Sequence, residues 1–599
     1  MRPEGKLVAV DVCVVDFYTD EPAGLGVPPY LGTTVRYVYG AVLAAGSRCR
    51  YINVDDLRLL WGRGAQAINL TKSRSEVGRI LERSDLIVTV GGMHTPGRYL
   101  RAMPGSPREI RRLVEDVGDS STTVVAGPVA IGTAAGGRSF RTTRRSLGEP
   151  DFLVTGDAEE FVYRLLSDGA PPDASALRTY EELSVYARRG TRLVEELPVR
   201  PELVAEVETS RGCSRWVVGG CSFCTECARY HLPSFRPPRD IVEEVRLLAR
   251  QGVRNVRLGR QACFFSYNAK GVGEREFPEP QPEEIENLLR GCSSAGLNSL
   301  HIDNVNPGLV ARYPEECRRI VRSIIRYCTP GNIAALGVES ADPEVVERNN
   351  LKALPEESMK AIRLISSLGS KVGWNGQPCF LPGINLLLGL PGETPETYHL
   401  NMEFLRRVLQ EGLLVRRINI RRVVQIPGTP LYGRRLSTKT VGRYSRSFVQ
   451  RVRSEIDRPM LRLCYPPGRI LRGLVAEVGY GDTTFCRFPG SYPVIVGVKG
   501  RIDVGSVVDS MVVDYGYRSL TGIPYPLDIN TCDSSVLKAL PGLGDRRVAR
   551  IIRSRPIRSM GDLVGSLSPD LPPRECLDMI SDACGLDGDG ATPWSRRHA

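Results

Sequence analysis

The sequence predicts an α/β protein of several domains: a doubly wound parallel sheet, a partial barrel of alternating strands and helices, a small β-barrel and a C-terminal helical hairpin. The chain has 599 residues, and one hydrophobic core rarely serves more than about 250–300 residues. Up to residue 435, apolar runs that end in turns alternate with helical patterns, which is typical of parallel sheets. Beyond residue 460, short strands around Gly-rich turns replace this pattern.

The first predicted domain covers residues 1–170. Apolar runs at 7–15, 86–90, 123–126 and 152–154 are its expected strands, and 107–117 is one of the helices between them. Ligands of doubly wound sheets bind at the carboxyl ends of the strands. The residues expected at those ends are Gly91, Gly92, His94, Gly127, Gly156 and Asp157.

A Pro-rich connector is expected over residues 171–205, followed by the barrel domain over 206–435. The predicted strands of the barrel are 255–258, 299–302, 334–338, 384–388 and 417–424. Helices are predicted at 241–251, 282–295, 315–327 and 356–368. In such barrels the chemistry lies at the carboxyl ends of the strands.

Three shorter segments complete the predicted chain. Residues 460–525 form a small antiparallel barrel with strands at 470–478, 492–498 and 506–515. Its basic and aromatic residues, Tyr492 among them, suit stacking on bases. Residues 526–585 form short helices around a Pro-Gly-Leu-Gly turn, and 586–599 form a disordered tail rich in Gly, Asp and Arg.

Composition bounds the class of protein. The net charge of +12 permits contact with RNA or DNA, although the Arg-rich composition also follows from a GC-rich genome. No signal peptide and no run of about 20 apolar residues is present, so we expect a soluble, cytoplasmic protein without a membrane partner. In that reducing compartment, clustered cysteines among the 16 more often bind metal than form disulfides.

The densest chemical signal is Glu-Thr-Ser-Arg-Gly-Cys213, followed by Cys221-Ser-Phe-Cys224. Three neighbouring thiolates can bind three irons of a [4Fe–4S] cluster and leave the fourth iron open. Two alternatives remain. Cys227 extends the motif to Cys-x-x-Cys-x-x-Cys, and all four cysteines could hold a structural zinc ion in a nucleic-acid-binding protein.

The motif resembles the signature of the radical S-adenosylmethionine (SAM) superfamily, in which three Cys are separated by three and two residues. An aromatic residue precedes the last Cys there, as Phe223 does here. The chain departs in its first spacing, because seven residues separate Cys213 from Cys221. The resemblance implies that SAM binds the open iron and is cleaved to a 5′-deoxyadenosyl radical. It also implies a ferredoxin- or flavodoxin-type electron donor as partner.

Three downstream segments resemble SAM-binding turns of the same superfamily. Leu-Gly259-Arg-Gln resembles the turn after the second strand, Gly-Val-Glu339-Ser a SAM-binding strand end, and Gly-Leu-Pro391-Gly-Glu-Thr the turn near the adenine. Polar residues also end the third strand. The implied SAM-binding residues are Gly259, Arg260, Gln261, Asp303, Asn304, Glu339, Ser340, Gly389, Pro391 and Gly392.

The N-terminal domain resembles the Rossmann-like, cobalamin-binding domain of radical SAM methyltransferases, so cobalamin is a candidate second cofactor and methyl transfer a candidate reaction. The Asp-x-His-x-x-Gly sequence that supplies a cobalamin ligand in some proteins is absent, and His94 is either a cofactor contact or a structural loop residue. The flanks of Cys213 also resemble tRNA methylthiotransferases. Those enzymes hold a second cluster on three N-terminal Cys, whereas only Cys13 and Cys49 lie in that region.

The C-terminal segment from 528 to 555 resembles a helix–hairpin–helix, whose turn presents backbone N–H groups to a phosphate. The candidate nucleic-acid-binding residues are Gly542, Gly544, Arg546, Arg547 and Arg550. The alternative is that the hairpin packs against protein. Together the segments predict a radical SAM enzyme that modifies RNA or protein.

Overall fold

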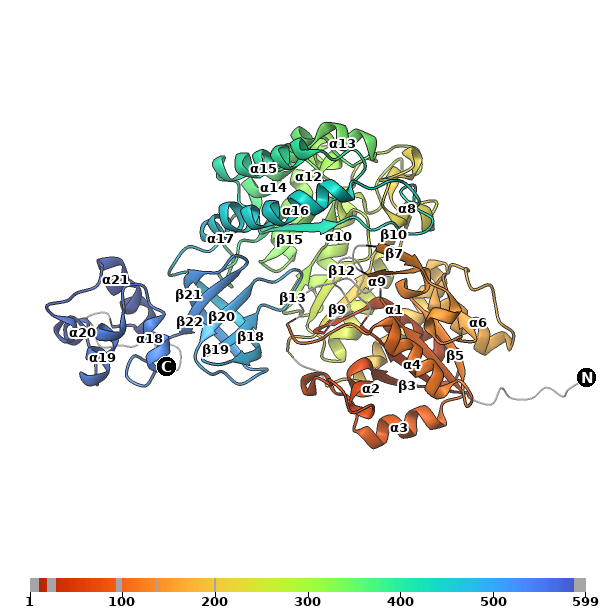
Figure 1. Ribbon diagram of the computed structural model, residues 1–599, viewed down its shortest axis with the longest axis horizontal. Helices are drawn as coiled ribbons and strands as arrows, with labels where there is room; N and C mark the ends of the chain where they lie inside the picture. Colours follow the sequence, from red (N-terminus) through yellow and green to blue (C-terminus); the bar gives the residue numbers. More distant parts are fainter. Residues whose placement is uncertain (1–9, 19–27, 93–99, 136–137, 199–200, 587–599) are drawn as a thin grey trace, which may run out of the picture.

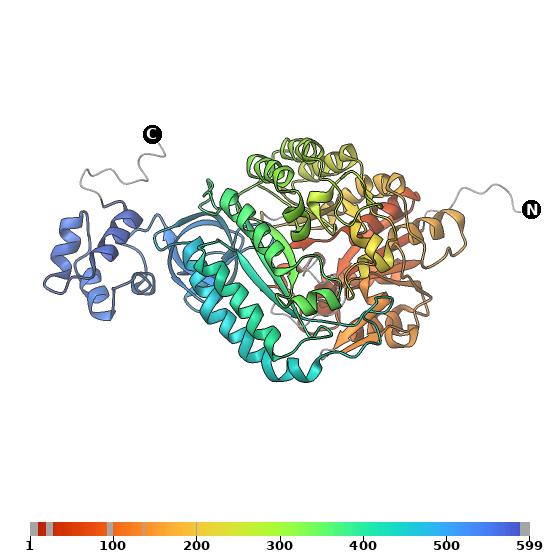
Figure 2. The same ribbon diagram turned by 90° about the horizontal axis from the view of Figure 1, so that it is seen from above.

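The computed structural model describes residues 10–18, 28–92, 100–135, 138–198 and 201–586 of the chain. The predicted multidomain α/β fold is confirmed (Figure 1). In Figures 1 and 2 the N-terminal sheet and the C-terminal helices lie at opposite ends of the molecule. No helix in the described ranges has the length and apolar character that crossing a bilayer requires.

The N-terminal sheet has the order β3-β1-β4-β5-β8, and all its strands are parallel. The strands are β1 (Asp11–Asp16), β3 (Arg48–Asn53), β4 (Leu86–Val90), β5 (Thr122–Ala126) and β8 (Phe152–Leu153). Helices α1 (Thr33–Ala44) and α6 (Ala158–Asp168) contribute to the core on one face, and α2 (Val54–Leu60), α3 (Arg74–Arg83) and α4 (Pro107–Val117) to the core on the other. Strand β3 was not predicted, because its first half alternates the exposed Arg48 and Arg50 with buried residues.

Two parallel sheets form the central barrel, in the orders β13-β12-β9-β2 and β14-β15-β16-β17. Their strands are β2 (Tyr30–Leu31), β9 (Val204–Glu208), β12 (Asn255–Gly259), β13 (Ser299–His301), β14 (Asn304–Val305), β15 (Asn332–Glu339), β16 (Phe380–Leu388) and β17 (Arg417–Arg422). Strand β9 falls where the connector was expected to end, and β2 comes from the N-terminal segment. Because β2 and β17 are both edge strands, the barrel is open between them.

Helices cover the outside of this barrel, and five of the longer ones each begin at a proline. They are α9 (Pro238–Arg250), α10 (Pro282–Ser293), α12 (Pro314–Tyr327), α14 (Pro355–Gly369) and α15 (Pro395–Gln410). Proline suits the first helical position because its missing N–H has no partner within the helix there. Alternate strand residues such as Leu258, Leu336 and Ile384 pack beneath these helices, and the residues between them face the barrel axis.

The small barrel is closed in the order β18-β19-β20-β22-β21. Its strands are β18 (Ile470–Tyr480), β19 (Thr483–Arg487), β20 (Ile495–Lys499), β21 (Val507–Tyr515) and β22 (Ser519–Tyr525). The expectation of a purely antiparallel barrel was wrong, because β20 and β22 pair in parallel. Its closed sheet leaves no unpaired edge.

The described C-terminal part holds α18 (Ser534–Lys538), α19 (Asp545–Arg553), α20 (Met560–Leu567) and α21 (Arg574–Cys584). These helices share one apolar core with the small barrel, in which Leu537 and Leu540 join Met511, Val513 and Ile523. The hairpin is therefore packed against its neighbour and is not an independent appendage.

Candidate active site

The loop after β9 carries four thiols. A short 3-10 turn, η4 (Ser214–Val218), takes up the long spacing between Cys213 and Cys221. Gly219 and Gly220 follow with positive φ angles of 80° and 68°, which suit glycine. A Cβ on Gly220 would lie 2.4 Å from the Cys227 sulfur, so this tight turn also requires a residue without a side chain.

The thiols are close enough to affect one another. The Cys227 thiol donates a hydrogen bond to Cys213, and this is the main cause that lowers the pKa of Cys213 to about 6. Burial raises the pKa of Cys224 to about 12. The Lys352 ammonium favours the thiolates electrostatically, and Arg215 Nη1 donates to the Cys221 sulfur at 3.1 Å. Two cations therefore oppose the negative charge that the thiolates would carry.

This donor set fits an iron–sulfur cluster. Cys221 packs in an apolar cluster with Val346, Leu351, Leu390 and Leu431, which excludes water. In the described ranges, no three His, Cys, Asp or Glu side chains converge on a point that could hold one metal ion. A zinc site requires sulfurs about 2.3 Å from one ion, whereas cluster thiolates bind different irons.

Two strand ends beside the thiols adopt a rare backbone conformation. Arg260 follows β12 with φ 59°, and Glu339 ends β15 with φ 62°. Non-glycine residues in this left-handed region concentrate at functional sites. Burial raises the pKa of Glu339 to about 7. A Cβ on Gly337 would lie 2.8 Å from Glu339 Oε1 and 3.0 Å from Lys352 Nζ, so the carboxylate and the ammonium lie near each other.

The Gly-Leu-Pro-Gly-Glu-Thr turn is connected to the thiol loop. Asn349 Nδ2 donates to the Pro391 carbonyl at 2.8 Å, and its Oδ1 accepts from Ser222 Oγ at 3.1 Å. Glu393 accepts from the Gly389 N–H at 2.6 Å, which holds the turn closed. The structure thus places the turn that contains Gly389, Pro391 and Gly392 next to Cys221, and Ser340 directly after Glu339.

The third strand end is arranged differently. Asn304 Nδ2 donates to the Gln261 carbonyl at 3.1 Å, which joins two predicted SAM-binding segments. Asp303 forms an ion pair with the buried Arg257 and accepts a hydrogen bond from Tyr492 of the small barrel. Asp303 therefore contacts a different domain and none of the thiols.

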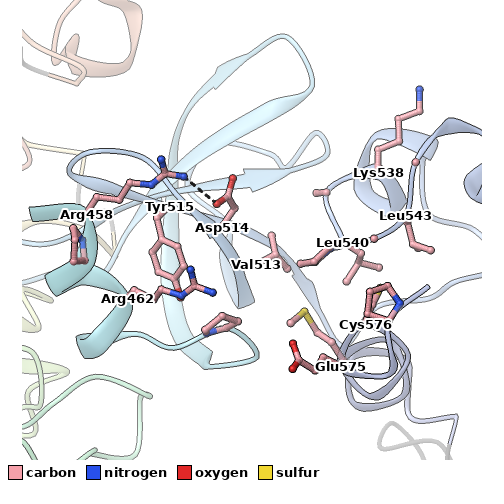
Figure 3. A pocket seen from close by; sticks show the side chains of 18 of the residues that line it. Arg458, Arg462, Val513, Asp514, Tyr515, Lys538, Leu540, Leu543, Glu575 and Cys576 are labelled. Atoms are coloured by element: carbon pink, nitrogen blue, oxygen red, sulfur yellow. Dashed lines mark ion pairs between the residues drawn. The ribbon is translucent and has the colours of Figure 1, made fainter. Parts of the chain in front are cut away.

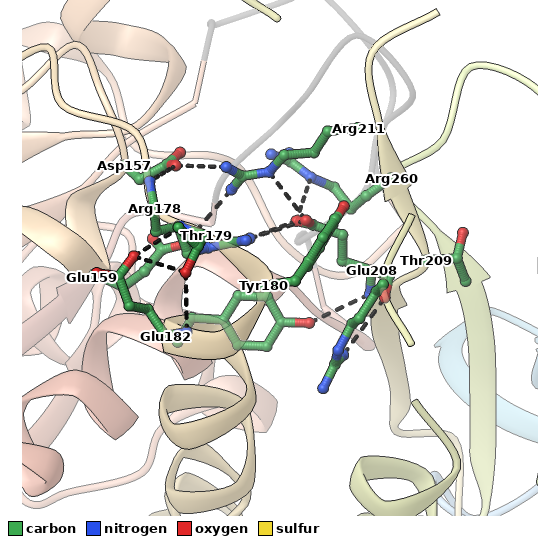
Figure 4. Close-up of polar contacts among 12 residues, drawn as sticks. Asp157, Glu159, Arg178, Thr179, Tyr180, Glu182, Glu208, Thr209, Arg211 and Arg260 are labelled. Carbon is green, nitrogen blue, oxygen red and sulfur yellow. Dashed lines mark hydrogen bonds and ion pairs between the residues drawn. The ribbon is translucent and has the colours of Figure 1, made fainter. Parts of the chain in front are cut away.

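A buried ionic network, drawn in Figure 4, joins the thiol loop to the N-terminal domain. Arg178 donates to both oxygens of Glu208 at 2.9 Å and to Glu159 at 2.6 Å. Arg211, two residues before Cys213, pairs with Asp157 and Glu208. Burial raises the pKa of Glu208, but Arg178 and Arg211 outweigh burial and lower it below its usual value.

The sequence did not predict this network, because Arg178 lies in the predicted connector and belongs to no recognisable motif. Figure 4 shows Arg260 directed toward the same Glu208 carboxylate, 4.0 Å away. Asp157 precedes α6 at the carboxyl edge of the N-terminal sheet. That edge is therefore fixed against both the thiol loop and the turn at Arg260.

The described residues include only some of the candidate residues that the sequence indicated in the N-terminal domain. His94 lies outside the described residues, as do segments 19–27 and 93–99, which follow β1 and β4. Cobalamin binding remains a prediction. Cys13 and Cys49 are buried in β1 and β3, and burial raises the pKa of both thiols. Neither has the exposed, low-pKa character of a reactive thiol.

Two of the predicted arginines of the C-terminal hairpin are engaged within it. Arg547 donates to the Gly542 carbonyl and to Asp570, both at 2.6 Å, and Arg550 donates to the Leu567 carbonyl at 3.1 Å. Arg546 is exposed, and Gly542 and Gly544 lie in the exposed turn.

A cleft of about 950 Å³ separates this turn from α17 (Arg458–Cys464) and β21 (Figure 3). Arg458, Arg462 and Lys538 line it together with Asp514 and Glu575. Cations and carboxylates both face the cleft, so its lining charges alone do not favour an anion.

Comparison with known proteins places these features in a wider group. Residues 207–405 match the family model described as Radical SAM superfamily. An uncharacterized protein of Methanocaldococcus jannaschii is 40% identical over 522 residues, 85% of this chain and 92% of that protein. An uncharacterized protein of Archaeoglobus fulgidus is 37% identical over 558 residues, 92% of this chain and 96% of that protein.

Among solved structures, the chain is similar to the radical SAM methyltransferase TsrM from Kitasatospora setae, whose structure has cobalamin and a [4Fe–4S] cluster bound. That similarity has 15% identity and a TM-score of 0.42, and covers 71% of this chain and 74% of the other. The cobalamin-dependent SAM radical enzyme OxsB has 13% identity and a TM-score of 0.45, over 69% and 53% of the two chains.

Proposed function

This chain belongs to the radical SAM superfamily, and from that premise we propose that Cys213, Cys221 and Cys224 hold its [4Fe–4S] cluster and that the radical it generates modifies RNA or protein. The observation that supports the assignment is that Cys213, Cys221 and Cys224 all act electrostatically on one buried cation, Lys352, together with Glu339. This site lies where the barrel strands end, as in other parallel β/α barrels.

A [4Fe–4S] cluster held by Cys213, Cys221 and Cys224 would supply, once reduced, the one electron for cleavage of the C5′–S bond of SAM to methionine and a 5′-deoxyadenosyl radical. The chain's own residues prepare this step. Lys352 and Arg215 offset the charge of the thiolates. Glu339 and Ser340 offer polar groups for SAM at the end of β15, and Arg260 does so at the end of β12. The apolar residues around Cys221 exclude water from this thiol.

Reductive cleavage of SAM is the direct test of this function. Anaerobically reconstituted protein, given dithionite and SAM, is expected to form 5′-deoxyadenosine, measured by chromatography and mass spectrometry. A protein with about four irons per chain that forms none of this product would contradict the assignment. Reconstituted protein without dithionite serves as the control, because the cluster must be reduced before it can transfer an electron.

RNA is the substrate class that we favour over protein. The net charge of +12 attracts polyanions. The exposed turn at Gly542 and Gly544, followed by the exposed Arg546, offers N–H groups and a free guanidinium to a phosphate.

Arg546→Ala is expected to weaken RNA binding and to reduce the slope of log K against log salt by about 1, because one phosphate contact is lost. Filter binding with a single-stranded RNA at several salt concentrations measures this. Arg322→Ala is the matched control, since Arg322 is an exposed arginine on the barrel helix α12. Equal slopes for the two variants would remove the hairpin from RNA binding.

A further inference from the structure

The inward face of the central barrel is polar and reached by water. On β15, β16 and β17 the residues that point away from the covering helices include Glu339, Asn385, Arg417, Asn419 and Arg421. All five are partly exposed although β15 and β16 are paired on both sides. A face filled by packed side chains would be buried on such central strands. The barrel axis is therefore open to a ligand at this level.

A loop of the small barrel, residues 488–494 between β19 and β20, covers the open side of the central barrel. Tyr30 on the edge strand β2 donates its hydroxyl hydrogen to the Gly490 carbonyl at 2.7 Å. Ser491 N–H donates to His301 Nδ1 at 2.8 Å. At the other edge, Arg416, directly before β17, donates to the Tyr492 carbonyl at 3.5 Å. The loop thus bridges the two unpaired edges.

Tyr492 extends from this loop into the base of the barrel. Its hydroxyl donates to Asp303 at 2.8 Å and accepts from Arg257 at 2.9 Å. Its ring lies between two guanidinium groups, 4.6 Å from Arg257 and 4.2 Å from Arg417. Tyr492 has a φ of 50°, so the backbone adopts an unfavourable conformation to hold the ring there. The expectation that Tyr492 stacks on bases at a surface is not compatible with this position.

Arg417 lacks the acidic partner that Arg257 has. Arg257 pairs with Asp303, whereas the Arg417 side chain contacts the Tyr492 ring and, among the described residues, forms no hydrogen bond or ion pair. Burial lowers the pKa of Arg417 to about 10. The charged side chains that also lower this pKa are all cations: Arg416, Arg421 and Arg518. Arg417 is only partly exposed and has no acidic partner, so an anionic ligand would supply the counter-ion that it lacks.

We propose that Arg417, above the Tyr492 ring, binds an oxyanion group of the substrate, a phosphate or a carboxylate. The planar guanidinium suits both groups, because it can donate two parallel hydrogen bonds. Asn385 and Asn419, whose side chains lie 3.3 Å apart, offer neutral donors on the same face. This inference rests on the proposed function, because it assumes that the substrate enters the barrel below SAM.

The register of β16 and β17 determines the distance between the substrate oxyanion at Arg417 and the substrate atom that reacts near SAM. Leu386 on β16 pairs with Glu339, and the next residue, Leu387, pairs with Arg421, so Arg421 lies near the level of the proposed SAM site. Arg417 is four residues earlier on β17, which corresponds to roughly 13 Å at about 3.3 Å per residue. The substrate is therefore expected to carry its oxyanion roughly 13 Å from the atom that reacts.

Binding of inorganic phosphate and of acetate to the reconstituted holoenzyme tests this inference. Thermal unfolding is followed at constant ionic strength while chloride is replaced by either anion, and the rise in Tm gives an apparent Kd. Wild type is expected to bind at least one of the two anions. Arg417→Gln is expected to raise that Kd by about tenfold or more, and Arg417→Lys by less, because lysine keeps the charge but loses the fork.

Arg322→Ala removes an exposed positive charge and is expected to leave the Kd unchanged. Tighter binding of phosphate than of acetate identifies a phosphate-bearing substrate, and the reverse identifies a carboxylate. Iron content and Tm in chloride confirm that the Arg417 variants fold. The inference is overturned if wild type binds neither anion, or if Arg417→Gln and Arg322→Ala bind as wild type does. Anion binding without SAM cleavage would contradict only the proposed function.

Discussion

Cys221→Ala and Cys224→Ala are each expected to abolish both the cluster and SAM cleavage. Two remaining thiolates bind only two of the irons, so the roughly four irons per chain are lost on reconstitution. Iron and sulfide analysis measures the first effect, and the yield of 5′-deoxyadenosine the second. Because no cluster means no electron for the sulfonium, the expected loss of product is complete.

A matched set of cysteine variants locates the third ligand. Cys532→Ser removes a half-buried thiol of the C-terminal domain and is expected to retain the cluster. Cys213→Ser is expected to lose it, and Cys227→Ser to retain it. The opposite result for this last pair would make Cys227 the ligand, which its contact with Cys213 makes a real alternative. Full iron in Cys221→Ala would show that the cluster lies elsewhere.

Arg211→Met is expected to lower the free energy of unfolding by about 3–5 kcal/mol, because it removes a buried cation that pairs with two buried carboxylates. The Arg211 side chain is only 7% exposed and pairs with Asp157 and with Glu208. The urea midpoint of the apo-protein measures the loss. Since Arg211 lies two residues before Cys213, we also expect the variant to retain less iron after reconstitution.

Arg111→Met is the control for that loss. Arg111 pairs with Glu115 four residues on, and both side chains are more than half exposed. Exposed helical pairs of this kind contribute only about 0.3–0.5 kcal/mol. Equal urea midpoints for the two variants would mean that the network in Figure 4 does not hold the thiol loop against the N-terminal domain.

Local pattern was enough to predict many elements. Strand β4 and helix α4 begin and end where the sequence analysis placed them, because an uninterrupted apolar run and a Ser-Pro helix start are local signals. Strands β3, β19 and β22 were missed, because buried residues alternate with exposed or partly exposed ones over part or all of each strand. An edge strand or a small-barrel strand has one exposed face, which shortens the apolar run that marks a buried strand.

Local sequence patterns were sufficient to predict the candidate site: three thiols in one short loop, and polar residues directly after strands of a parallel barrel. These features are local, since spacing and periodicity act over a few residues. The packing of the domains, in contrast, is what pairs Arg178 with Glu208, holds one loop of the small barrel between Tyr30 and Arg416, and brings Tyr492 against Arg417. Such contacts join residues up to 460 positions apart. They depend on how whole domains pack, and no periodicity in the chain records that packing.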